Sequence, residues 1–224
     1  MPHFEALRVP DQTARAYVRI PDGATAGVVV LHAWWGLNED VIACADRLAD
    51  AGYAVLAPDM FGGEIATEVE DAERLAQKGD EGADRFAFAA VDDLAARLGR
   101  AAPLAVLGFS FGAAYALLVP SERDRVSATV VYYGTYTGPF LERSKAPVLG
   151  HFAETDPFEP AESVDALEAA LRAAGRSATI HRYAGTGHWF AEPSRDAYSP
   201  EAAELAFDRT LAFLDEQLRR GEAG

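Results

Sequence analysis

The stretch Leu104–Leu118, LAVLGFSFGAAYALL, decides how this chain folds. Its first four residues are an apolar run typical of a buried strand, and an Ala- and Leu-rich helical segment ends it. Between them lies Gly108-Phe109-Ser110-Phe111-Gly112, a G-x-S-x-G turn whose glycines lack the Cβ atoms that would clash in a strained bend. The turn predicts that the Ser110 hydroxyl projects at a helix N-terminus, where free N–H groups favour a developing oxyanion. A tight turn without chemistry is the alternative, and partner residues must decide between the two.

Short apolar runs alternate with helical patterns on both sides of this stretch, which predicts a mostly parallel sheet covered by helices on both faces. The runs are continuous rather than alternating, as expected for strands that are buried on both faces. We expect strands at Ala16–Ile20, Val28–His32, Ala54–Ala57, Leu104–Leu107, Ala128–Tyr132, Val148–Phe152 and Thr179–Tyr183.

Helices are expected in the intervals between these strands. They run from the cap Asn38 to about Asp50, over Val69–Leu98 with a break near Gly79–Gly82, directly after Ser110, over Glu162–Ala174, and after Pro200. Because no repeat or long linker interrupts the pattern, we expect a single domain over residues 1–224.

Composition and charge narrow the class of protein. With 224 residues, half of them hydrophobic, the chain is long enough for one well-buried core. Its net charge of −15 repels phosphate, which argues against nucleic acid and anionic membranes as partners. The longest apolar run, Gly27–Leu37, is too short to span a bilayer, and the charged start of the chain does not resemble a signal peptide.

The chain has one cysteine, Cys44, so an internal disulfide is excluded. It lies in an apolar helical pattern, which favours a buried, unreactive thiol. Together with the start of the chain and the length of its apolar runs, these features predict a cytoplasmic protein. We expect a monomer or a small homo-oligomer, and the sequence does not choose between them.

A serine hydroxyl is a weak nucleophile at neutral pH and needs a base, usually a histidine held by a carboxylate. Only three of the five histidines follow Ser110: His151, His181 and His188. His151 and His181 lie inside strand patterns, which favours structural roles. His188 lies in the glycine-rich loop after the last strand, where parallel sheets carry their chemistry. We predict His188 as the general base, with a structural loop histidine as the alternative.

The acid is expected in the loop that follows the strand Val148–Phe152. That loop, AETDPFEP at 153–160, offers Glu154, Asp156 and Glu159. We prefer Asp156, because an aspartate followed by proline makes a fixed turn that holds its carboxylate. Glu154 is the second choice, and a solvated acidic loop is the structural alternative. The chain order Ser, Asp, His is that of the three-layer α/β-hydrolase fold, in which a mostly parallel twisted sheet is flanked by helices on both faces.

Five segments resemble the dienelactone hydrolase family in order and spacing, over nearly the whole chain. They are HAWWGLN at 32–38, YAVLAPDMFGG at 53–63, GFSFGAAYAL at 108–117, GHFAETDPF at 150–158 and GTGHWFAEP at 185–193. The resemblance implies a compact α/β-hydrolase without a large lid that cleaves esters or lactones without a metal or cofactor. It also implies an oxyanion hole formed by the backbone N–H groups of Trp34 and Phe111. The motif alone indicates Phe111, the residue after the nucleophile.

Three positions depart from the family pattern. The best-known members have a cysteine where this chain has Ser110, and a glutamate that manages the thiol's proton where it has Ala33. The two changes are consistent, because a serine activated by His188 has no thiolate to control. A serine that replaces a natural cysteine is the alternative explanation. Glu192 stands where dienelactone-cleaving members carry an arginine for the substrate carboxylate, and a charged Glu192 facing the pocket would favour neutral esters.

These residues predict acyl transfer from a small ester or lactone to Ser110 and then to water. Trp35, Trp189, Phe190 and Glu192 are candidate pocket residues, although aromatic side chains are more often core. Two other functions stay open: a non-catalytic ligand-binding or interaction protein on the same fold, and a thioesterase or peptidase.

Overall fold

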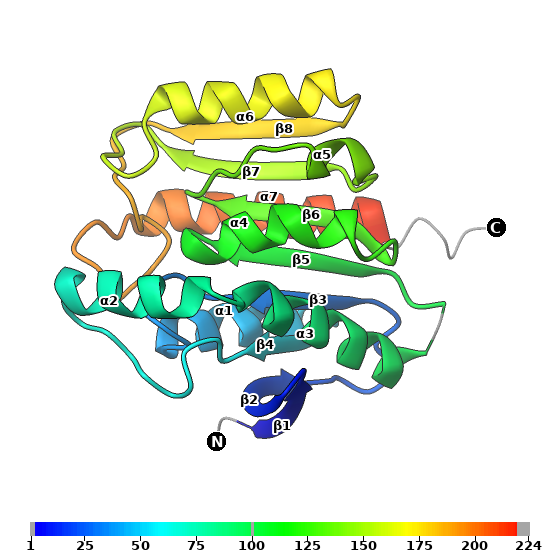
Figure 1. Cartoon of the computed structure of the whole chain (residues 1–224). Helices are drawn as coiled ribbons and strands as arrows, with labels where there is room; N and C mark the ends of the chain where they lie inside the picture. The colour runs from blue at the N-terminus through cyan, green and yellow to red at the C-terminus, as the bar shows by residue number, and fades with distance from the viewer. Residues whose placement is uncertain (1–2, 100, 219–224) are drawn as a thin grey trace.

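A computed structural model of the chain describes residues 3–99 and 101–218 (Figure 1). Its centre is an eight-stranded sheet with the spatial order β1-β2-β4-β3-β5-β6-β7-β8. The strands are β1 (Phe4–Val9), β2 (Gln12–Arg19), β3 (Gly27–Leu31), β4 (Ala54–Pro58), β5 (Leu104–Phe109), β6 (Val126–Tyr132), β7 (Val148–Ala153) and β8 (Ala178–Tyr183). β2 is antiparallel to both of its neighbours, and all pairs from β4 to β8 are parallel.

Helices cover both faces of this sheet. They are α1 (Glu39–Asp50), α2 (Val69–Asp80), α3 (Ala83–Leu98), α4 (Phe111–Leu118), α5 (Phe140–Arg143), α6 (Ala161–Ala173) and α7 (Pro200–Leu218), with a 3-10 turn at Val119–Ser121. In Figure 1, α3 and α4 lie in front of the sheet, α1 and α7 lie behind it, and α6 lies alongside the edge strand β8. This three-layer arrangement confirms the predicted fold class.

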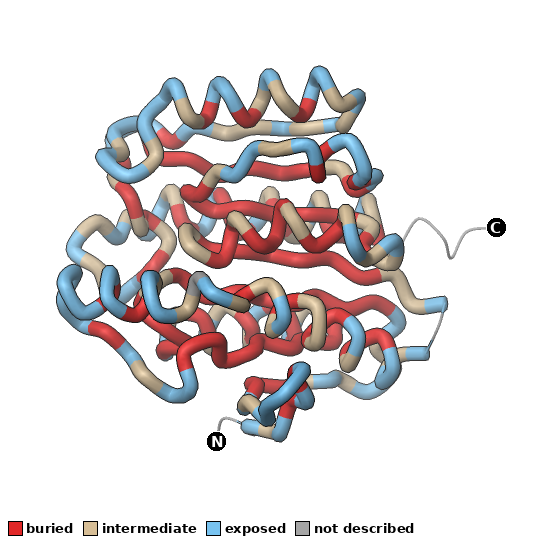
Figure 2. Tube along the Cα trace, viewed as in Figure 1, coloured by how far each residue is buried: buried red, intermediate tan, exposed pale blue. Residues whose placement is uncertain are grey.

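The core lies between the sheet and its two helical layers, as the buried central strands in Figure 2 show. Every residue of β3, β4 and β5 is buried. The continuous apolar runs of the sequence therefore have the predicted cause, which is burial on both faces. Among the described residues, no helix combines the length and the apolar character needed to cross a bilayer.

β1 is absent from the strands predicted above. It pairs with β2 through a tight turn at Pro10-Asp11, where Asp11 has a φ of 66°. β1 is an edge strand whose residues are mostly exposed or half-buried, so it needs no apolar run and escapes a search for one. The short helix α5 was also not predicted, because its four residues are too few to show a helical pattern.

The predicted helix boundaries agree with the local chemistry. The Asn38 side chain accepts a hydrogen bond from the Val41 N–H at 3.1 Å and caps α1, and Gly52 follows this helix with a φ of 94°. Gly82, with a φ of 110°, separates α2 from α3, which confirms the break expected near Gly79–Gly82.

Candidate active site

Ser110 forms the sharp turn between β5 and α4, with φ 45° and ψ −110°. Side-chain-bearing residues rarely adopt a positive φ, so this conformation stores strain. A Cβ on Gly108 would lie 2.4 Å from the carbonyl oxygen of Gly112, and one on Gly112 would lie 2.5 Å from that of Leu31. The two glycines are thus required by close backbone approach, and the turn sets Ser110 at the carboxyl edge of the parallel strands.

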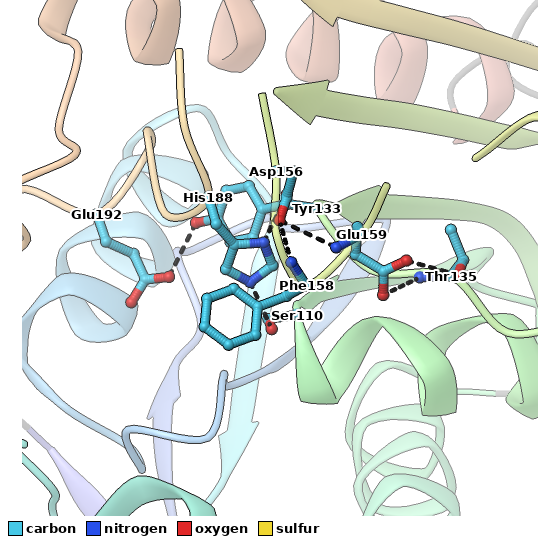
Figure 3. Close-up of polar contacts among 8 residues, drawn as sticks. All are labelled: Ser110, Tyr133, Thr135, Asp156, Phe158, Glu159, His188 and Glu192. Carbon is cyan, nitrogen blue, oxygen red and sulfur yellow. Dashed lines mark hydrogen bonds and ion pairs between the residues drawn. The ribbon is translucent and has the colours of Figure 1, made fainter. Parts of the chain in front are cut away.

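The side chains of Ser110, His188 and Asp156 form one hydrogen-bonded series (Figure 3). Ser110 Oγ lies 3.0 Å from His188 Nε2, and His188 Nδ1 lies 2.6 Å from Asp156 Oδ2. The His188 and Asp156 side chains are 3% and 2% exposed, so water screens their interaction little. When Nδ1 donates to the carboxylate, Nε2 is left as the acceptor for the serine proton.

Backbone N–H groups orient the Asp156 carboxylate. Its Oδ1 accepts from the N–H of Phe158 at 2.9 Å and from that of Glu159 at 3.0 Å, which leaves Oδ2 for His188. This is the fixed turn expected at the Asp-Pro step. Glu154, the second choice, instead accepts from the Gly185 N–H at 2.8 Å, so it joins the acid loop to the backbone of the loop that carries His188.

Glu159, the third acidic residue of this loop, binds the loop to the segment that follows β6. Its carboxylate accepts from the Thr135 N–H at 3.0 Å and from the Thr135 hydroxyl at 2.7 Å (Figure 3). Burial raises the pKa of Glu159, and the bonds from Thr135 oppose that rise. The acid-bearing loop is therefore held at both ends.

The loop that carries Trp34 is fastened by His32, a residue that the sequence analysis did not single out. His32 is fully buried; its Nδ1 donates to the Ala33 carbonyl at 2.7 Å, and its Nε2 accepts from the Met60 N–H at 3.0 Å. Burial lowers the pKa of His32 to about 4, so the ring is neutral and supplies the one donor and one acceptor that these bonds need. A histidine that ends a fully apolar strand is the signal that could have revealed it.

Phe111, the other predicted oxyanion donor, is the first residue of α4, where the N–H has no partner within the helix. The contribution of Trp34 and Phe111 to an oxyanion hole stays a prediction.

Aromatic side chains surround His188. Phe158 and Trp189 contact its ring at centroid distances of 5.0 and 4.9 Å, and Trp34 contacts both of them at 5.3 and 5.9 Å. We call Trp34, Phe158 and Trp189 the aromatic rim. Phe158 is 45% exposed and was not among the predicted pocket residues. Trp35, which was among them, is only 2% exposed and packs edge-on against Trp34 and Trp189.

Two predicted pocket residues lie behind the site instead. Phe190 is fully buried against Tyr133 and Tyr183, at ring distances of 5.5 and 4.9 Å, so it belongs to the core. Glu192 is 2% exposed, and its Oε1 accepts from the Tyr133 hydroxyl at 2.9 Å. Burial raises the pKa of Glu192 to about 8, so it is mostly uncharged at neutral pH. The expectation of a charged Glu192 facing a substrate is therefore wrong, because the turn after His188 directs this side chain inward.

His151, His181 and Cys44, for which the sequence favours structural roles, lie in surroundings that agree with such roles. His151 is fully buried; Nδ1 lies 2.8 Å from the Tyr183 hydroxyl and Nε2 lies 3.0 Å from that of Thr210. Burial lowers the pKa of His181, which lies on the edge strand β8. Burial also raises the pKa of the Cys44 thiol to about 12, which agrees with an unreactive thiol. Within the described residues, no group of three or more His, Cys, Asp or Glu side chains converges as a metal site would require.

Comparison with known proteins relates this arrangement to one family. Residues 14–218 match the model of the dienelactone hydrolase family. Protein usf of Aquifex pyrophilus is 30% identical over 216 residues, which cover 91% of this chain and 94% of the relative. A putative carboxymethylenebutenolidase of Aquifex aeolicus is 27% identical over 217 residues, which cover 92% and 94%. The solved structure of a putative dienelactone hydrolase from Klebsiella pneumoniae has a TM-score of 0.83 at 24% identity and covers 96% of this chain and 99% of its own, a likeness of fold.

Proposed function

This chain belongs to the dienelactone hydrolase family and is an ester or lactone hydrolase, and we propose that it is a serine hydrolase acting through Ser110, His188 and Asp156. One observation carries the proposal: the 3.0 Å contact of Ser110 Oγ with His188 Nε2 continues through the 2.6 Å contact of Nδ1 with Asp156. A nucleophile, a base and an orienting acid in hydrogen-bonded series are the arrangement that acyl transfer needs.

In the first half-reaction, Ser110 Oγ attacks the carbonyl carbon of the ester or lactone while its proton passes to His188 Nε2. The Asp156 carboxylate keeps the Nδ1 proton and stabilises the imidazolium. The carbonyl oxygen becomes an oxyanion, and the proposed donors to it are the N–H groups of Phe111 and Trp34. When the C–O bond to the alcohol breaks, the alkoxide takes the proton from His188 and an acyl ester on Ser110 remains.

In the second half-reaction, His188 takes a proton from water as the water oxygen attacks the acyl ester. The tetrahedral species collapses, Ser110 Oγ regains its proton from His188, and the carboxylic acid leaves. Ala33, where thiol-bearing family members have a glutamate, offers no second acid or base, so His188 handles every proton transfer in this scheme.

We further propose that the preferred substrates are small neutral esters or lactones. The support is the aromatic rim of Trp34, Phe158 and Trp189 next to His188, an apolar surface that binds hydrocarbon better than a carboxylate. Arginines from the helical region 68–85 have other partners: Arg74 pairs with Glu64 at 3.5 Å, and Arg85 donates to the Glu81 carbonyl at 3.5 Å. These contacts give no support for either arginine as a binding group for a substrate carboxylate.

The test compares Ser110→Ala with the matched control Ser121→Ala. Ser121 is the serine just beyond α4, and its hydroxyl donates to the Leu118 carbonyl. We expect Ser110→Ala to lose about 10⁴-fold or more in p-nitrophenyl ester hydrolysis, and Ser121→Ala to keep wild-type activity. A phosphonate ester probe should label wild-type Ser110 and nothing else.

The substrate panel also includes thioesters and peptide amides. Faster cleavage of either class than of esters would replace the proposal by a thioesterase or peptidase. A wild-type protein that neither hydrolyses any of them nor takes up the phosphonate would instead be a non-catalytic binding protein.

A further inference from the structure

A buried carboxyl group lies behind the proposed base and has no part in the scheme above. Glu192 Oε1 accepts from the Tyr133 hydroxyl at 2.9 Å, and Oε2 is buried without a hydrogen-bond partner among the described residues. A carboxyl group placed this way costs folding free energy, because half of its polar surface loses water and gains nothing. Such a group needs an explanation, and its position next to His188 suggests one.

Tyr133 connects Glu192 to His188. Its ring is fully buried, and its centroid lies 5.0 Å from that of His188 with the planes at 59°. Tyr133 has a φ of 37°, a rare value for a residue with a side chain, and its N–H donates to the His151 carbonyl at 2.8 Å. A residue held in such a conformation at a site commonly serves to place a group there.

The turn after His188 returns the chain to the same tyrosine. Trp189 has a φ of 66°, and the Glu192 N–H donates to the Trp189 carbonyl at 2.9 Å, which closes a four-residue turn. This turn directs the Glu192 side chain inward to Tyr133, as Figure 3 shows. The contacts thus form a closed path from His188 along the backbone to Glu192, through its hydrogen bond to Tyr133, and back to the His188 ring.

This path limits a rotation of the ring that its own hydrogen bonds restrain only loosely. The hydrogen bonds at Nε2 and Nδ1 tolerate some angular deviation, so by themselves they still allow a limited rotation of the ring about its Cβ–Cγ bond. Packing on the ring faces must limit that rotation. Phe158 and Trp189 are two of the neighbours; Phe158 is 45% exposed and Trp189 is half-buried. Tyr133 is fully buried and is the most enclosed of the three.

We propose that Glu192, acting through Tyr133, is a positioning residue that holds the His188 ring in line with Ser110. The inference rests on the proposed function, because it assigns His188 the role of base. It also gives the turn 189–192 a purpose in this chain that differs from binding a substrate carboxylate.

The test uses variants that change one atom group at a time. Tyr133→Phe keeps the ring and removes the hydroxyl, and Glu192→Leu removes the acceptor. We expect each to lower kcat about 10- to 100-fold with KM nearly unchanged, because a misplaced base slows the chemical step and not binding. Glu192→Gln keeps an oxygen that can accept from Tyr133 and should restore kcat to within about 3-fold of wild type.

Tyr132→Phe is the matched control, since Tyr132 is the neighbouring buried tyrosine and its hydroxyl bonds to Thr210 at 2.8 Å, away from His188. Rates are divided by the number of sites that the phosphonate probe labels at completion, so unfolded protein does not count. Wild-type kcat in Tyr133→Phe, or an equal loss in Tyr132→Phe, overturns the positioning role while ester hydrolysis by the wild type stands. A wild type without ester hydrolysis overturns the proposed function itself.

Discussion

Asp156 and Glu154 leave the same loop two residues apart, but their carboxylates have different partners. Asp156 reaches His188 Nδ1, whereas Glu154 accepts from the Gly185 backbone. We expect Asp156→Asn to lower kcat for a p-nitrophenyl ester about 10⁴-fold, because the amide can donate to Nδ1 and so favour the wrong tautomer. Glu154→Gln keeps an acceptor for Gly185 and should stay within a few-fold of wild type. The opposite order of the two losses would identify Glu154 as the acid.

At the same scale, Glu192 gives folding stability an unusual pH dependence. Burial raises its pKa from the ordinary 4.5 to about 8; a nearby Asp40 adds to the rise, and Tyr133 and Arg195 oppose it. Between these two pH values the folded protein holds a proton that the unfolded chain has released. Stability therefore falls as pH rises through this window, and the loss is complete above the folded-state value.

Glu192→Gln removes this proton linkage. The stability of the variant relative to wild type should rise from pH 5 to pH 9 by on the order of a few kcal/mol, measured by urea unfolding at several pH values. Asp40 and Arg195 stay in place in both proteins, so their titration cancels. A difference that does not change with pH would mean that Glu192 is ionised in the folded protein.

At the scale of elements, α4 packs so closely on β3 that only glycine fits between them. A Cβ on Gly112 would lie 2.5 Å from the Leu31 carbonyl oxygen and 2.7 Å from that of His32. Gly112→Ala should therefore push α4 away from β3, cost about 1–3 kcal/mol of stability or more, and lower kcat because Ser110 and Phe111 move with the helix.

Gly187 is the matched control for this substitution. A Cβ there would meet nothing closer than 3.7 Å, an ordinary contact. Gly187→Ala should melt close to the wild-type temperature in a thermal unfolding experiment. Equal melting temperatures for the two variants would show that the approach of α4 to β3 is not what requires Gly112.

At the scale of the whole molecule, a net charge of −15 adds to the effect of the aromatic rim. The long-range field repels anionic substrates, and salt weakens it. For a neutral ester and its carboxylate-bearing analogue, we expect a several-fold higher kcat/KM for the neutral compound, with a gap that narrows as sodium chloride is added. A preference for the anionic compound at low salt would instead require a cationic group close to Ser110.

The parallel sheet, the turn at Ser110 and the loops that carry Asp156 and His188 could all be predicted from the amino-acid sequence. These features depend on local properties: unbroken apolar runs for strands buried on both faces, and glycines where backbones come close. Within the acid loop, the turn made by the Asp-Pro step favoured Asp156 over Glu154, and Asp156 is the one that contacts His188 Nδ1. Its role as the acid stays a prediction.

The directions of the loop side chains, in contrast, depend on contacts that the folded chain makes. Glu192 and Phe190 follow His188 closely in the chain and were expected in the pocket, yet both are buried behind it. Their direction depends on the turn closed at Trp189 and on Tyr133, 59 residues from Glu192 in the chain. The edge strand β1 was missed because it has no apolar run of its own. Its place in the sheet is set by its pairing with β2. Contacts between residues far apart in the chain thus set the burial, and with it the charge, of groups that look exposed in the sequence.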